Sequence, residues 1–134
     1  MGDTMNLDDK LGAWSPTVLS ALRIMASLLF LQHGLVKLFG FPMPGPANFQ
    51  LVSLIGLAAV IELVGGVLLT LGLFTRVVAI IMSGEMAFAY FMGHAPSSFF
   101  PIVNRGEAAI LFCFVFLTIA TAGGGRWSLD AARR

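Results

Sequence analysis

Residues 28–41 read LLFLQHGLVKLFGF. The stretch is apolar enough to lie inside a membrane, yet it carries Gln32, His33 and Lys37 where lipid chains would lie. An ionisable side chain near the middle of a bilayer costs about 2.5–3.5 kcal/mol to insert, so such residues normally face the interior of a helix bundle and pair there. These three residues are therefore either tolerated near the end of a span or part of a site.

The whole chain has the composition of a membrane protein. Its 134 residues are 57% hydrophobic and only 11% charged, whereas soluble domains carry about 25% charged residues. Four apolar stretches cover residues 17–39, 50–74, 77–95 and 106–122, and about 20 apolar residues suffice to cross a bilayer. We therefore predict an all-α fold, a four-helix transmembrane bundle over residues 17–122. The net charge of +1 argues against nucleic-acid binding.

Turn residues mark the connections between these stretches. A Pro- and Gly-rich segment occupies 40–49, a short connection follows at 72–77, and residues 94–106 separate the last two stretches. Short connections make consecutive helices antiparallel neighbours, which predicts an up-down-up-down order.

Basic residues predict the orientation of the bundle. One side would carry Lys10, Arg76, Arg126, Arg133 and Arg134. The other side would carry only Arg105, with Lys37 close to that surface. Because basic residues concentrate on the cytoplasmic side, we expect both termini there, with residues 1–16 and 123–134 as cytoplasmic segments. The first 16 residues lack the basic and short apolar regions of a cleaved signal peptide, so the first span is predicted to be an uncleaved insertion signal.

The chain has one cysteine, Cys113, inside the fourth apolar stretch. A single thiol excludes an intramolecular disulfide, and with it the membrane redox proteins that work through paired thiols. Any redox chemistry would therefore pass through another group.

Ionisable residues within the spans carry balanced charges. Arg23 and Lys37 lie in the first stretch, Glu62 in the second and Glu85 in the third. Buried charges must pair, so we predict a buried ion pair of Arg23 with Glu62 or Glu85. Such a pair has two readings, a purely structural one that holds the helix register and one in which the two glutamates also form a proton-accepting relay.

More polar residues are predicted to gather toward the opposite, outer end of the bundle. The candidate ligand-binding residues are His33, Lys37, Tyr90, His94, Asn104, Arg105 and Glu107. At about 100° per residue, Arg23, His33 and Lys37 share one face of their helix, which should point into the bundle, whereas Gln32 points the opposite way. Polar groups with aromatic neighbours suit a small ligand with carbonyl or hydroxyl oxygens. A quinone fits, because Lys, Arg and His donate to its oxygens and Glu moves protons.

Simpler readings stay open for several of these residues. His33 and Lys37 either face the ligand or combine a packing hydrogen bond with a side chain that snorkels to the surface. Glu107 either lines the pocket or forms a local salt bridge with Arg105. We predict no metal site, because the two histidines and a carboxylate that could form one lie on different helices without a ligand spacing. No haem is predicted, since His33 and His94 should lie at different depths, and no flavin is predicted, since the sequence has no flavin motif.

Four blocks of the chain resemble the DoxX family of small bacterial and archaeal membrane proteins. The blocks are LLFLQHGLVKLFG, AAVIELVGGVLLTLGLFTR, FFPIVNRGEAAILF and GGGRWSLD, and the resemblance runs over about 20–131. The matching positions are His33, Lys37, Glu62, Gly65, Gly66, Arg76, Phe99, Phe100, Pro101, Asn104 and Glu107. The resemblance implies a multi-pass protein of the cytoplasmic membrane. Family members are linked to a quinol-linked respiratory complex, to thiosulfate:quinone oxidoreduction and to oxidative-stress complexes, but the family provides no agreed catalytic residues.

These observations lead to three hypotheses about function. The first is a quinone- or small-redox-ligand-binding subunit of a membrane oxidoreductase or oxidative-stress system, which needs a soluble or membrane redox partner because the chain has no redox cofactor motif. The second is a non-catalytic membrane scaffold that docks a soluble redox enzyme. The third, a small-solute or proton transporter, is disfavoured because four helices without a repeat leave little room for alternating access. Besides lipid contacts, small residues and Gln32 suggest a homo-oligomer.

Overall fold

The computed structural model describes residues 4–134, and this part of the chain is helical without any strand. Its α-helices are α1 (Leu7–Ala13), α2 (Ser15–Phe39), α3 (Leu54–Leu71), α4 (Thr75–Ala89), α5 (Pro101–Asn104), α6 (Glu107–Ala122) and α7 (Leu129–Ala132). A π-helical turn (Tyr90–His94) and a 3₁₀ turn (Ala95–Ser97) continue α4. The predicted all-α class is thus confirmed for the described residues.

Three segments of the described chain are long and apolar enough to cross a membrane, namely Ser15–Phe39, Leu54–Leu71 and Thr75–Ser97. Helix α6 is also apolar but has 16 residues. At about 1.5 Å per residue it reaches roughly 24 Å, less than the about 30 Å of a typical hydrocarbon core. Helix α3 begins at Leu54 rather than at residue 50, because the Ser53 hydroxyl accepts the Gly56 N–H and caps the helix there.

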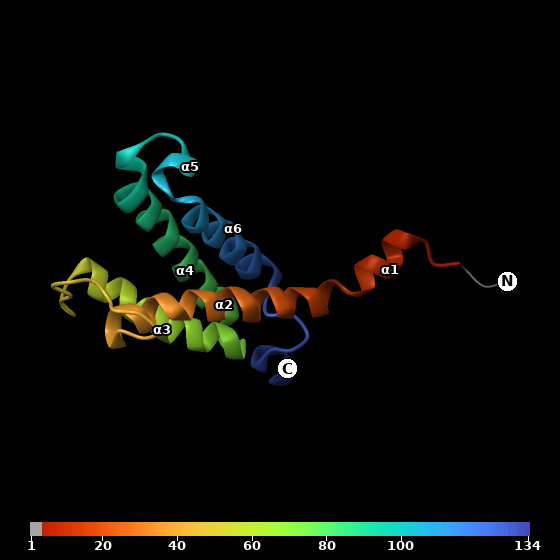
Figure 1. Ribbon diagram of the computed structural model, residues 1–134. Helices are drawn as coiled ribbons and strands as arrows, with labels where there is room; N and C mark the ends of the chain where they lie inside the picture. The colour runs from red at the N-terminus through yellow and green to blue at the C-terminus, as the bar shows by residue number, and fades with distance from the viewer. Residues whose placement is uncertain (1–3) are drawn as a thin grey trace.

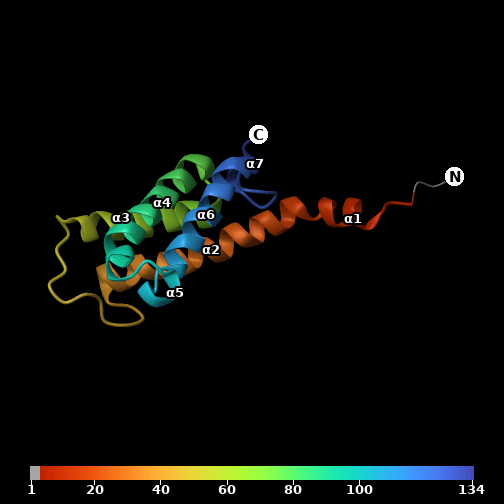
Figure 2. The same ribbon diagram turned by 90° about the horizontal axis from the view of Figure 1, so that it is seen from above.

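The helices form two hairpins that diverge from each other. Helix α2 packs along α3 and α4 packs along α6, with fewer contacts between the pairs. Figure 1 shows α4 and α6 rising away from α2 and α3, and Figure 2 shows that α1 projects beyond the bundle. We call the end with residues 40–53 and 95–106 the loop end, and the end with residues 72–74 and 123–134 the tail end. The hairpins meet toward the tail end and separate toward the loop end.

Close helix contacts explain why the hairpins hold together. A Cβ atom at Gly34 would lie 2.9 Å from the Leu63 nitrogen, so α2 and α3 touch almost backbone to backbone there. Phe30 and Phe116 are the largest fully buried apolar side chains, and their rings meet edge to face with centroids 5.0 Å apart. This aromatic contact joins α2 to α6 across the two hairpins.

The C-terminal segment folds back over the tail end. Arg23 is fully buried, and its Nη1 and Nη2 donate to the carbonyls of Gly124 at 2.6 Å and Trp127 at 2.7 Å. The Ser20 hydroxyl accepts the Trp127 N–H at 2.9 Å. The predicted ion pair of Arg23 with Glu62 or Glu85 is therefore wrong. The physical reason is that the tail reaches back to Arg23 and its carbonyls satisfy the guanidinium, which the helix pattern does not reveal.

The tail also caps helix α4. Phe74, the residue before α4, provides no side-chain cap and has a left-handed φ of 52°. The Asp130 carboxylate accepts the N–H groups of Phe74 at 3.0 Å and Thr75 at 2.8 Å instead. Partial burial alone would raise the pKa of Asp130, but the hydrogen bonds from Thr75 and Phe74 and the nearby charge of Arg133 outweigh it and lower that pKa.

Replacing this carboxylate should weaken the fold in a pH-dependent way. We expect Asp130→Ala to lower the free energy of unfolding by about 1 kcal/mol at neutral pH, as for the loss of a helix cap. Because the folded pKa lies below the ordinary value of 3.8, the contribution is present above that pH and is lost as the pH falls through the folded pKa. Melting curves from about pH 7 to about pH 3 should show the wild type and the variant converging in acid. The exposed Asp8→Ala is the control, and a constant difference would contradict the capping role.

Candidate functional site

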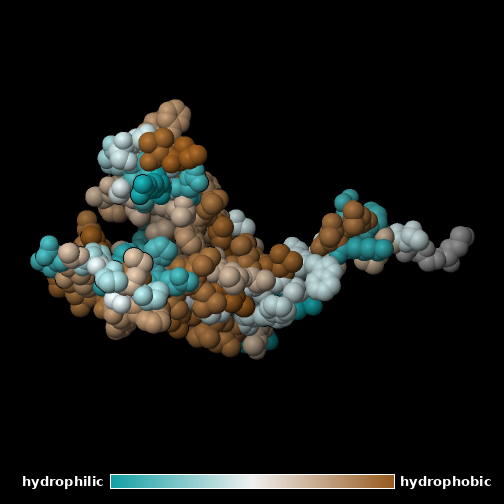
Figure 3. Space-filling model, in the orientation of Figure 1, coloured by the Kyte–Doolittle hydropathy of each residue, from teal (hydrophilic) through white to brown (hydrophobic). Residues whose placement is uncertain are grey.

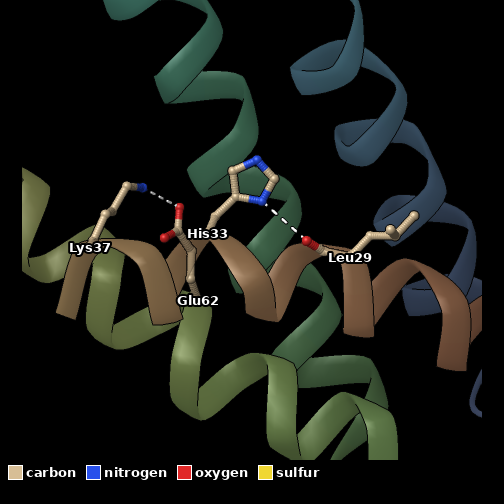
Figure 4. Close-up of polar contacts among 4 residues, drawn as sticks. All are labelled: Leu29, His33, Lys37 and Glu62. Carbon is tan, nitrogen blue, oxygen red and sulfur yellow. Dashed lines mark hydrogen bonds and ion pairs between the residues drawn. The ribbon is translucent and has the colours of Figure 1, made fainter. Parts of the chain in front are cut away.

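An ion pair between a half-buried lysine and a buried glutamate joins the two helices of the first hairpin. Lys37 Nζ lies 2.6 Å from Glu62 Oε1, and the two side chains are 23% and 3% exposed. It is the one salt bridge within residues 4–134, and Figure 4 shows it bridging α2 and α3. Gly34 lies about one helical turn before Lys37 on α2, and a Cβ atom there would lie 3.1 Å from the Glu62 Cβ. This close approach of the two helices brings the Glu62 carboxylate within reach of Lys37.

A second carboxyl group lies beside this pair. Glu85 of α4 is close enough to Glu62 and Lys37 for their charges to interact. Among the described residues, no donor reaches Glu62 Oε2 or either carboxyl oxygen of Glu85, although all three atoms are buried. Buried polar atoms without partners are costly and usually mark a site that a proton, water or ligand completes.

His33 stands one turn before Lys37 on the same face of α2. Its Nδ1 lies 3.1 Å from the Leu29 carbonyl, so in the neutral ring Nδ1 donates and Nε2 remains an acceptor. Figure 4 shows the exposed ring standing off α2 toward α4 and α6. The Phe112 ring of α6 packs against it edge to face, with centroids 6.2 Å apart. We call His33, Lys37, Glu62 and Glu85 the polar cluster.

The polar cluster lies where the two hairpins begin to separate. Figure 3 shows the molecule hollowed between its two limbs, with hydrophilic side chains in the hollow. We call this space the inter-hairpin cleft. A half-buried ion pair, a second carboxyl group and an exposed imidazole thus lie close together, and they can donate hydrogen bonds, accept them and hold a proton.

Three of the predicted ligand-binding residues form a separate group at the loop end. Asn104 is buried, and its Nδ2 donates to the Tyr90 hydroxyl at 3.2 Å and the Ser98 carbonyl at 3.0 Å. Its Oδ1 accepts the Gly106 N–H at 2.8 Å, and its carbonyl lies 3.0 Å from His94 Nδ1. Each polar atom of the Asn104 amide is therefore used to fold the loop between α4 and α6.

Arg105 and Glu107 follow Asn104 closely in the chain, but their side chains take no part in its hydrogen bonds. Both residues are exposed, and neither side chain has a hydrogen bond or an ion pair with any residue of the described chain. The alternative prediction of a salt bridge between them is therefore wrong for this structure. Glu107 lies nine residues before the buried Phe116, which at about 100° per residue places it on the opposite, outward side of α6.

The sequence did not identify the tail residues that hold the tail end. The carbonyls of Gly124 and Trp127 accept from Arg23, which lies about a hundred positions earlier in the chain. Asp130 contacts the start of α4 at Thr75. Two signals were available. Ser20 and Arg23 are polar residues three apart on one face of an apolar helix, and the glycines at 123–125 allow the chain to approach closely.

Comparisons with known proteins agree with the resemblance in the sequence. Residues 18–95 match the family model described as DoxX, and this range includes all four residues of the polar cluster. A Haemophilus influenzae protein described as uncharacterized is 41% identical over 91% of this chain and 95% of its own length. An uncharacterized membrane protein of Mycobacterium tuberculosis is 30% identical over 90% of this chain and 83% of its own length. No solved structure matches.

Proposed function

The chain belongs to the DoxX family and is a membrane protein, and from this premise we propose that it binds a quinone in the inter-hairpin cleft as a subunit of a membrane oxidoreductase or oxidative-stress system. The observation that carries the proposal is the polar cluster. It combines a half-buried Lys37–Glu62 ion pair with a second carboxyl, that of Glu85, whose buried oxygens have no donor among the described residues. An ionisable group inside a membrane protein costs free energy to insert, and such groups usually belong to functional sites.

In the proposed topology four helices span the cytoplasmic membrane of a bacterium or archaeon. Helix α6, although short, would cross together with the residues that flank it. The tail end would be cytoplasmic, since it carries Arg76, Arg126, Arg133 and Arg134. The cleft would then open toward the opposite face, within reach of ligands dissolved in the lipid.

The residues of the polar cluster fit a ligand with two ring oxygens. The Lys37 ammonium has three donor hydrogens and spends one on Glu62, so it can donate to a carbonyl oxygen. His33 Nε2 can accept from a hydroxyl. The oxygens Glu62 Oε2 and Glu85 Oε1 and Oε2 are buried without a donor among the described residues, so each can accept from a ligand hydroxyl. A bound quinone would accept two electrons from a reduced partner protein and two protons to become the quinol. In this proposal a protonated Glu85 donates one of these protons to a quinone oxygen, water donates the other, and Glu85 then recovers its proton from water.

Site variants should lose quinone without unfolding. We expect His33→Ala and Glu85→Gln to lower the content of bound quinone plus quinol about two- to tenfold, because one hydrogen bond between neutral groups is worth about 0.5–1.5 kcal/mol. The proteins would be purified in mild detergent and extracted with organic solvent, and quinone would be quantified by mass spectrometry. Melting temperature reports whether each variant is folded.

Two matched controls sharpen this experiment. Gln32→Ala removes the exposed neighbour of His33, and Glu107→Gln makes the same chemical change on the outward side of α6. Both should keep the wild-type quinone content. Wild-type occupancy in His33→Ala and Glu85→Gln would end the pocket proposal. A soluble redox enzyme that copurifies with all four variants would then support the scaffold hypothesis, and solute flux in liposomes the transporter hypothesis.

A further inference from the structure

An apolar groove runs between α3 and α4, next to the polar cluster. It has a volume of about 230 Å³, and each of its lining residues is apolar. Val60, Ile61 and Val64 line it from α3, and Val78, Ile81 and Met82 line it from α4. Gly65 lies at the point where the helices touch, since a Cβ atom there would be 2.9 Å from Met82 Sδ. The groove is thus a shallow channel between two helices that touch at Gly65.

The groove leads to the two glutamates. On α3, Ile61 directly precedes Glu62. On α4, Glu85 lies one turn closer to the loop end than Met82, and at about 100° per residue its side chain emerges between those of Ile81 and Met82. The groove therefore approaches Glu62 and Glu85 from the α3–α4 side, whereas His33 lies on the α2–α6 side of the polar cluster.

We propose that this groove holds the hydrocarbon chain of the quinone whose head binds the polar cluster, an inference that rests on the proposed function. A polar site that continues into an apolar channel matches a ligand with an oxygen-bearing ring and a hydrocarbon tail. A helix of this or another protein is about 10–12 Å across with its side chains, too wide for a groove of this volume. A single hydrocarbon chain is narrow enough to enter.

Packing, rather than escape from water, would hold the chain in place. Lipid tails are as apolar as the valines of the groove, so moving a hydrocarbon chain from lipid into the groove gains no hydrophobic energy. What it gains is close contact with side chains on two helices. The effect of the groove should therefore depend on its shape, and filling it with a larger side chain should displace the tail.

Two photoreactive quinone analogues test this inference in lipid nanodiscs that contain the full chain. One carries a diazirine in its hydrocarbon chain and the other an azide on its ring. We expect the chain probe to label groove residues of α3 and α4, and Val64→Phe to lower this labelling at least about fivefold. Val67→Phe is the matched control, because Val67 is 44% exposed on the same helix but outside the groove, and Val64 is 51% exposed.

The two probes separate failure of the inference from failure of the proposed function. Ring labelling near the polar cluster, with chain labelling spread evenly over the lipid-facing residues, would overturn the groove assignment and leave the quinone site standing. If the ring probe does not label residues near the polar cluster, both the groove assignment and the proposed quinone site are wrong. A phospholipid with a diazirine in its acyl chain provides the remaining arm. If it labels the groove and excess quinone does not displace it, the groove is a lipid site and the inference is wrong.

Discussion

Lys37→Met should lower the free energy of unfolding by about 3 kcal/mol, one of the largest effects we expect for a single substitution in this chain. Removing one partner of a buried ion pair costs about 3–5 kcal/mol, because the other charge stays buried without compensation. Glu62 is 3% exposed, whereas Lys37 is 23% exposed, which places the effect near the lower limit. Thermal and denaturant unfolding in mild detergent would measure it.

The double variant Lys37→Met/Glu62→Gln identifies the cause. If the loss comes from an uncompensated carboxylate, neutralising that carboxylate should restore most of the stability, and the double variant should be more stable than Lys37→Met alone. Lys10→Met, which removes an exposed lysine of α1, is the control. If the double variant instead loses as much stability as Lys37→Met and Glu62→Gln lose together, the ion pair has no coupling energy, contrary to its geometry.

Arg23→Leu should release the C-terminal segment and destabilise the chain by about 3–6 kcal/mol. The estimate adds two hydrogen bonds from a charged donor, each worth about 1.5–3 kcal/mol. Both carbonyl acceptors, on Gly124 and Trp127, lose their charged donor when the guanidinium is removed. Hydrogen exchange of residues 123–132, together with limited proteolysis of the tail, would report the release.

Two further arginine variants make this test specific. Arg23→Lys should recover only part of the protection, since an ammonium lacks the planar fork that reaches two carbonyls at once. Arg126→Leu removes an exposed arginine of the same tail and should leave the protection unchanged. A tail that stays protected in Arg23→Leu would show that Ser20, Asp130 and the glycines suffice to hold it.

The contacts of the C-terminal segment explain why the cleft opens at one end only. The segment at 123–132 contacts α2 through Ser20 and Arg23, and it contacts the start of α4 through Asp130. It therefore ties both hairpins together at the tail end. The loops at the opposite end join helices only within a hairpin, and within residues 4–134 no segment like the tail links the two hairpins there.

Some features of this protein could be predicted from local sequence. Apolar stretches identified the helices, because burial in lipid requires long apolar segments whatever their neighbours are. The four-residue spacing of His33 and Lys37 placed them on one face of α2, because helix geometry alone determines which residues share a face. Family membership followed from blocks that can be read along the chain.

Local sequence could not predict which side chains pair across helices. Arg23 and Lys37 are both cations on α2. The helix pattern predicted Arg23 as the partner of a buried glutamate, whereas Lys37 pairs with Glu62 in the structure. Likewise the predicted ligand-binding set split into the polar cluster, the Asn104 loop and the outward-facing Glu107. Helical periodicity determines the face on which a residue lies, whereas the element opposite that face depends on how the hairpins cross and on where the tail returns. Local sequence thus determined the helices, their faces and the family, and only the tertiary structure decided that Lys37, Glu62 and Glu85 meet.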